Sequence, residues 1–142
     1  MFGAASLKLP AALALLLLLG PEQAPAAGAL AIGATEDLAN GYSIGIAINA
    51  RTEDEARNGA LAWCRANGST QTQARCAIVE TFHNQCVAEA NDPAPGTPGA
   101  GWGVGPSQTA AEAKAMDMCL ATAGESRRLF CKAVKYMCDG QP

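Results

Sequence analysis

Apolar and polar residues change their spacing several times along the chain, and each change predicts an element. Residues 53–66 and 111–123 place small apolar residues at helical spacing, so that each segment has one apolar face. Short runs rich in β-branched, aromatic and Cys residues flank these two segments, as is typical of strands. The predicted strands are 42–49, 76–82, 86–90, 101–105 and 131–138.

The two helical segments belong to an internal repeat. Under a shift of 55 positions, residues of the same or similar type coincide: Cys64 with Cys119, Cys76 with Cys131, Val79 with Val134, and Thr52 with Ser107. A fixed shift of this kind indicates a duplicated structural unit. The pattern predicts an α+β fold of two β-α-β(-β) repeats, which form an antiparallel sheet with two helices packed on it and are fastened by disulfides.

The repeat divides the chain into segments. We expect the duplicated domain to span 41–139, with one repeat at 41–91 and the other at 101–139. Residues 92–100, rich in Pro and Gly, should form the loop between the repeats. Residues 27–40 are expected to be a flexible N-terminal segment.

Both predicted helices have a capping box at their start. Thr52 with Glu55 fits the pattern in the first helix, and Thr109 with Glu112 fits it in the second.

The N-terminus has the pattern of a secretory signal peptide. Lys8 precedes an apolar run from Ala11 to Leu19, and Ala24-Pro25-Ala26 offers small residues for cleavage. A retained membrane anchor is the alternative, but the run is about half the roughly 20 residues that a spanning helix needs. We therefore expect residues 1–26 to be removed, at a site that the sequence leaves open, and the protein to be periplasmic or secreted.

Six cysteines in a small exported chain indicate structural disulfides. A metal site is the competing interpretation, but the chain has no C-x-x-C pair and one histidine, so no metal is expected. The repeat favours two equivalent bridges and leaves a third pair, which would connect the two repeats. The favoured pairs are Cys64–Cys76, Cys119–Cys131 and Cys86–Cys138, and the other pairings that six cysteines allow remain open.

These residues resemble a known family. The stretches "EARNGALAWC", "AAEAKAMDMC", "CAIVETFHNQCVAEA" and "GAGWGVG" are similar to bacterial exported proteins of the domain of unknown function 4189 family. The resemblance covers roughly residues 41–139. It implies an exported α+β domain and supplies neither an activity nor catalytic residues.

Candidate site residues are few. His83, Glu80 and Trp102 are the residues we single out for binding. His83 with Cys86 could act as base and nucleophile, but a disulfide sulfur is not a thiolate, so no catalytic residue is assigned. If the strands after the two helices are neighbours, Glu80 and Lys135 are expected to form a cross-strand ion pair.

Net charge and the lack of known motifs exclude some classes of function. The net charge of −3 argues against nucleic-acid binding, and the glycines of "GAGWGVG" lack the residues of a phosphate-binding loop, so no cofactor is expected. The remaining hypothesis is a non-catalytic binding or inhibitory module of the cell envelope, whose partner is an exported protein or a cell-wall component. A carboxylate-dependent hydrolase is the alternative. The oligomeric state is left open.

Overall fold

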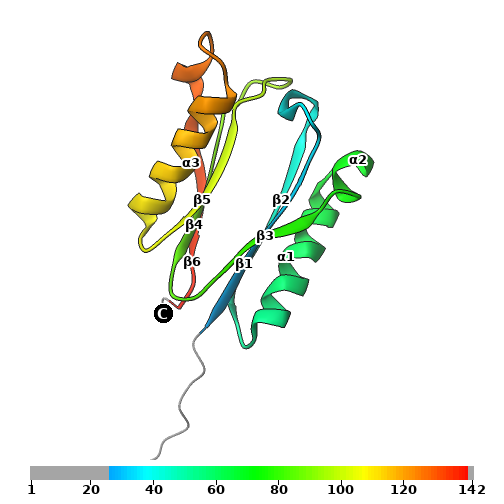
Figure 1. Cartoon of the computed structure of the whole chain (residues 1–142), viewed down its shortest axis with the longest axis vertical. Coiled ribbons are helices and arrows are strands. Elements are labelled where there is room, and N and C mark those ends of the chain that lie inside the picture. The colour runs from blue at the N-terminus through cyan, green and yellow to red at the C-terminus, as the bar shows by residue number, and fades with distance from the viewer. Residues whose placement is uncertain (1–25, 141–142) are drawn as a thin grey trace, which may run out of the picture.

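The computed structural model describes residues 26–140 and shows two units of the same build (Figure 1). The predicted signal peptide therefore lies outside the described residues, apart from Ala26. Each unit is a three-stranded antiparallel sheet with one long helix on its outer face. Among the described residues, no helix has the length and apolar character needed to cross a membrane.

The first unit runs β-β-α-β along the chain. Its elements are β1 (Ala27–Ala34), a 3-10 turn η1 (Leu38–Asn40), β2 (Tyr42–Ala50), α1 (Glu53–Asn67), α2 (Thr70–Gln73) and β3 (Ala77–Phe82). The strand order in the sheet is β2-β1-β3, so β1 lies at the centre.

The second unit repeats this plan. Its elements are β4 (Cys86–Asn91), β5 (Ala100–Gly105), α3 (Gln108–Thr122), a 3-10 turn η2 (Arg128–Phe130) and β6 (Lys132–Cys138). The strand order is β5-β4-β6, with β4 at the centre in the place that β1 holds in the first unit.

The two sheets face each other and the helices lie outside them, which gives four layers (Figure 1). Small side chains fill the two outer interfaces: the alanines of β1 pack against α1, and the alanines of β4 pack against α3. Larger side chains fill the interface between the sheets: Leu30, Ile32, Ile46, Phe82, Val87 and Val104. The core is thus bulky only between the sheets.

Each helix lies directly on a strand because glycines in that strand let it approach. A Cβ atom at Gly45 would stand 2.0 Å from the carbonyl oxygen of Ala60, and one at Gly101 would stand 2.1 Å from that of Ala115. Any larger residue at these positions would push the helix off the sheet.

The three disulfides replace part of the stabilisation that a large core would give. Cys64–Cys76 and Cys119–Cys131 each join the long helix of a unit to the chain just before its last strand. Cys86–Cys138 joins opposite residues of β4 and β6. These are the pairs that the repeat favours, but the third bridge lies within the second unit and does not connect the units.

A buried carboxylate holds the two units together where β2 and β6 end. Asp139 accepts hydrogen bonds from the backbone N–H groups of Asn49, at 2.6 Å, and Asn84, at 3.1 Å. Gly140 N–H donates to the Asn49 side chain at 2.8 Å. The residues just after β6 are thereby joined to β2 and to the turn between β3 and β4.

The α+β class, both long helices and all five predicted strands are confirmed. The expected flexible segment 27–40 is instead β1 and η1, because its alternating small and large residues are buried on both faces of a central strand. The predicted first repeat, 41–91, included β4. In the structure β1 completes the first sheet and β4 belongs to the second sheet, so the boundary between the units lies before β4. The strands form two sheets where one was expected.

For the first helix the predicted cap Thr52 is confirmed, but the box is incomplete because the Glu55 carboxylate accepts from Arg51 N–H, at 3.2 Å; for the second helix the prediction is wrong. Thr52 accepts a hydrogen bond from Glu55 N–H at 3.1 Å. In α3, Ser107 is the cap, with Ala110 N–H at 3.2 Å, and Thr109 lies inside the helix. Ser107 is the residue that coincides with Thr52 under the repeat.

Candidate binding groove

The structure does not gather the predicted site residues around one hollow. His83 is exposed in the turn after β3, where its Nδ1 lies 2.9 Å from the carbonyl oxygen of Ala26. Glu80 is exposed on β3, an edge strand of the first sheet, and Trp102 is half-buried on β5 in the second. None of the three lines the groove that the structure forms elsewhere.

This groove, of about 610 Å³, is lined in part by β2 and β6, an edge strand of each sheet. Four elements contribute its lining: Tyr42, Ser43, Ile44 and Ile46 from β2, Trp63 and Asn67 from α1, Glu89 from β4, and Lys135 and Met137 from β6. Aliphatic, aromatic and charged groups therefore share the surface.

A hydrogen bond between the two units fixes the polar part of the groove. The Tyr42 hydroxyl donates to Glu89 Oε1 at 2.6 Å and accepts from Asn91 Nδ2 at 3.2 Å. The ring of Trp102 lies 6.4 Å from that of Tyr42, tilted by 37°, so Trp102 supports the site without lining it. Burial, reinforced by the bond to Glu89, raises the pKa of the Tyr42 phenol well above its ordinary value.

Glu89 stands where the first unit has a leucine. In the second sheet Glu89 pairs with Trp102 and Lys135, and in the first sheet Leu30 makes the corresponding pairs with Ile46 and Glu80. Leu30 is 1% exposed and Glu89 is 9% exposed. A buried carboxylate needs compensating partners, whereas leucine needs none. The fold therefore has no need of an acid at this position.

Lys135 supplies the groove's cation. It lies opposite Glu89 across β4 and β6. The predicted pair of Glu80 with Lys135 is wrong, because the two residues belong to different sheets. They hold equivalent places in these sheets, since each follows a bulge at one of the equivalent valines, Val79 and Val134.

Trp63 forms an apolar wall of the groove. Although it lies on α1, 61% of its surface is exposed, more than a side chain packed for stability would leave. Beside the polar groups of Glu89 and Lys135, it gives the groove a surface for contact with a ligand.

The groove lining contains a single carboxylate. Glycoside hydrolysis requires two carboxyl groups within about 10 Å of each other. The groove lining has one, Glu89, which already accepts the Tyr42 hydrogen bond. In the described part of the chain, no group of three or more His, Cys, Asp or Glu residues is placed to hold a metal.

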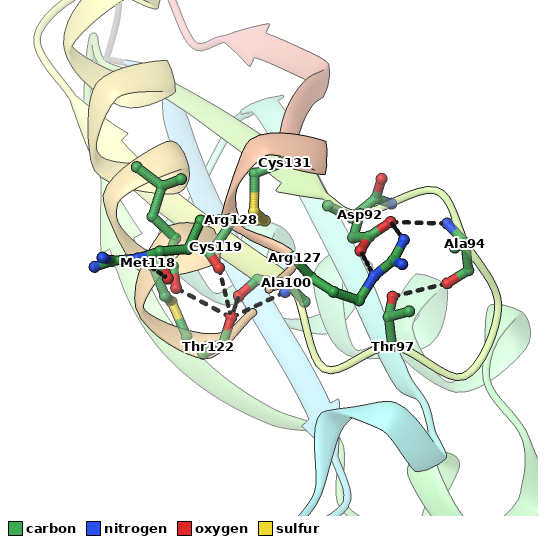
Figure 2. Close-up of a disulfide and its surroundings, with 12 residues drawn as sticks. Asp92, Ala94, Thr97, Ala100, Met118, Cys119, Thr122, Arg127, Arg128 and Cys131 are labelled. Carbon is green, nitrogen blue, oxygen red and sulfur yellow. Dashed lines mark hydrogen bonds and ion pairs between the residues drawn. A yellow bond between two sulfur atoms is a disulfide. The ribbon is translucent and has the colours of Figure 1, made fainter. Parts of the chain in front are cut away.

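Tyr42 also borders a second hollow, which is lined by the loop between β4 and β5. Residues 91–97 line this shallow hollow, of about 250 Å³. Asp92 anchors this loop through two bonds from Arg127, Nε to Oδ2 at 2.5 Å and Nη2 to Oδ1 at 3.0 Å, and it accepts from Ala94 N–H at 3.0 Å (Figure 2). The Arg127 guanidinium holds the pKa of Asp92 down, at about 2.

A family model with the description Domain of unknown function (DUF4189) matches residues 27–138. The chain belongs to this family. The match begins with β1 and ends with β6, so the DUF4189 domain is the complete pair of units. This confirms the resemblance and extends it to β1. Comparison with curated proteins and with solved structures finds no match.

Sequence reasoning missed Tyr42 and Glu89, which form the hydrogen bond between the units at the groove. They lie 47 positions apart and in different units. A second shift of the sequence would have shown the unusual acid: 59 positions bring "AGALAI" onto "CVAEAN" and place Leu30 on Glu89.

Proposed function

We propose that this DUF4189 domain is an exported, non-catalytic binding module that holds an extended segment of another exported protein in the groove between β2 and β6. Export is supported by the N-terminal pattern and by the three disulfides, which are typical of oxidising compartments. If the captured segment belongs to an exported enzyme or toxin, the module is an inhibitor.

The observation that carries the proposal is the pair of unpaired strand edges at the groove. β2 and β6 are edge strands, and an edge strand presents N–H and C=O groups that no neighbouring strand uses. Among the described residues, the β2 backbone has one hydrogen-bond partner in the second unit, Asp139, at Asn49. An extended peptide can use the remaining groups by adding a strand.

The side chains around these edges can supply specificity. Trp63 and Met137 offer apolar contact, while Glu89 and Lys135 offer one charge of each sign. The groove volume of about 610 Å³ also falls within the roughly 300–1,000 Å³ typical of ligand sites.

Site-specific photo-crosslinking tests the proposal. A photoreactive residue is placed at position 63 on the groove wall and, as a matched control, at Val79, which is similarly exposed on an edge strand of the first sheet away from the groove lining. After irradiation in envelope extract, we expect a discrete protein adduct at position 63 and none at 79. Glu89→Gln should reduce the yield at least fivefold.

Other results would contradict the proposal. Equal adducts at the two positions would mean non-specific contact. A cell-wall glycan recovered in place of a protein would assign the groove to a different ligand class, and an unchanged yield in Glu89→Gln would remove the groove's acid from recognition.

A further inference from the structure

A second surface, away from the groove, combines exposed apolar and basic side chains. The turn η2 and the first residue of β6 carry four exposed residues, Arg128, Leu129, Phe130 and Lys132, which we call the corner patch. Leu129 is 95% exposed and Phe130 is 49% exposed. Burying such side chains is normally favourable, so their exposure invites a binding explanation.

The first unit shows that the fold does not need these residues. Under the 55-residue shift, the corner patch coincides with Gln73, Ala74, Arg75 and Ala77. The same corner, before the equivalent disulfide and strand, therefore has no large apolar side chain in the first unit. The apolar pair is a property of the second unit alone.

Positive charge is concentrated around the same corner. Residues 126–138 contain four Lys and Arg residues and no Asp or Glu, while the other residues of 27–142 contain five Lys and Arg against twelve Asp and Glu. The matching first-unit segment, 71–83, has one Arg and one Glu. Of these four, Arg127 is paired with Asp92 and Lys135 lines the groove, so Arg128 and Lys132 are the cations that the corner patch presents on an otherwise acidic chain.

The backbone next to the corner patch is anchored to the rest of the second unit. The disulfide Cys119–Cys131 fixes the residue after Phe130 to α3, and Arg127, three residues before Phe130, is paired with Asp92 (Figure 2). The Arg127 guanidinium also lies 4.5 Å from the centre of the Phe130 ring. Little conformational entropy is lost when a surface fixed in this way binds.

We propose that the corner patch docks the domain on membrane surfaces that contain anionic lipids. Leu129 and Phe130 enter the headgroup boundary, and Arg128 and Lys132 contact the lipid phosphates. A leucine that projects almost fully from a turn between two cations suits insertion into a lipid surface better than packing against a protein, which would offer it a pocket. The contact is weak and reversible, and is independent of the groove.

Vesicle co-sedimentation tests this docking. The chain from residue 27 onward, which contains every described element, is mixed with vesicles of phosphatidylcholine alone or of phosphatidylcholine with an equal amount of phosphatidylglycerol. We expect binding to the anionic vesicles only, weakened by salt. Leu129→Ser with Phe130→Ser, and separately Arg128→Gln with Lys132→Gln, should each lower the binding constant at least tenfold.

The controls come from the first unit and from the groove. Arg75→Gln removes a cation from the equivalent corner, and Val79→Ser removes a similarly exposed apolar side chain; both should bind as the unchanged protein does. Trp63→Ala should also bind normally, which separates this test from that of the proposed function. Urea unfolding identifies any variant that fails to fold. If the Leu129→Ser, Phe130→Ser variant does not fold, the Arg128→Gln, Lys132→Gln variant alone decides the test.

Several results would overturn the proposal. These are equal binding to both kinds of vesicle, equal losses in the control variants, or self-association in the absence of lipid that the corner variants abolish. Capture of an acidic protein through the patch, with no vesicle binding, would also overturn it.

Discussion

Replacing Glu89 with leucine, the residue at the equivalent place in the first unit, should leave the stability of the fold almost unchanged while removing binding in the groove. The substitution loses the hydrogen bond from the Tyr42 hydroxyl, 2.6 Å long, and a bond to a charged group contributes about 1.5–3 kcal/mol. A leucine buried between the sheets gains about 1.5–3 kcal/mol. The two effects offset, so the free energy of unfolding should change by no more than about 1 kcal/mol.

Alanine at the same position provides the matched comparison. Glu89→Ala loses the same hydrogen bond and leaves space next to Val87 and Met137, with no apolar gain. It should lower the free energy of unfolding by about 2–4 kcal/mol. The difference between the leucine and alanine variants therefore measures the apolar character of the site.

Urea unfolding with intact disulfides, followed by fluorescence of Trp63 and Trp102, measures both variants, and photo-crosslinking at position 63 measures the loss of binding. A loss of about 3 kcal/mol or more in Glu89→Leu would show that the fold requires the carboxylate. If Glu89→Leu had normal stability and unchanged crosslinking, the reasoning would also be refuted, because the carboxylate would then be needed neither for the fold nor for binding.

Further measurements test individual contacts. In Tyr136→Phe, which leaves Tyr42 as the one tyrosine, tyrosinate absorbance should appear only well above pH 10, because burial and Glu89 raise the pKa of Tyr42. The stabilisation that Tyr42 gives the fold is therefore complete below about pH 10 and is lost as the pH rises further. Absorbance near pH 10 in the folded protein would contradict this. Arg127→Gln should flatten the loss of stability between about pH 4 and 2, where the lowered pKa of Asp92 contributes, and an unchanged acid limb in urea titrations would exclude the pair from acid stability. Asp139→Ala should lower the free energy of unfolding by about 2–4 kcal/mol, because its carboxylate accepts two backbone N–H bonds, at 2.6 and 3.1 Å. An unchanged urea midpoint would show that these bonds between the units do not stabilise the fold.

The sequence was sufficient for the elements that have strong local patterns. Both long helices combine a small-residue face with a capping residue, and the predicted strands are rich in β-branched and aromatic residues. β1 was missed because "AGALAIGA" has little intrinsic strand preference and follows a predicted cleavage site. Its small residues are explained only by tertiary structure, since Ala27, Ala29 and Ala31 lie against α1.

Strand pairing could not be inferred from neighbouring positions in the sequence. The three residues between β3 and β4 suggest a hairpin, but the chain there passes from one sheet to the other, and β4 pairs with β5 and β6. The same crossing brings Tyr42 of the first unit to Glu89 of the second. The groove therefore depends on how the two sheets stack, which no local pattern specifies.

The duplication separates what the fold requires from what it does not. Where both units have the same residue, a steric or covalent reason is present: Gly45 and Gly101 admit the helices, and equivalent cysteines form equivalent bridges. Where the units differ at equivalent positions, the fold tolerates either residue, so the difference needs another explanation. Glu89 in place of leucine completes the groove, and Leu129 in place of alanine completes the corner patch. Both lie in the second unit, so exchanging these residues for their first-unit counterparts should remove each binding property without loss of the scaffold.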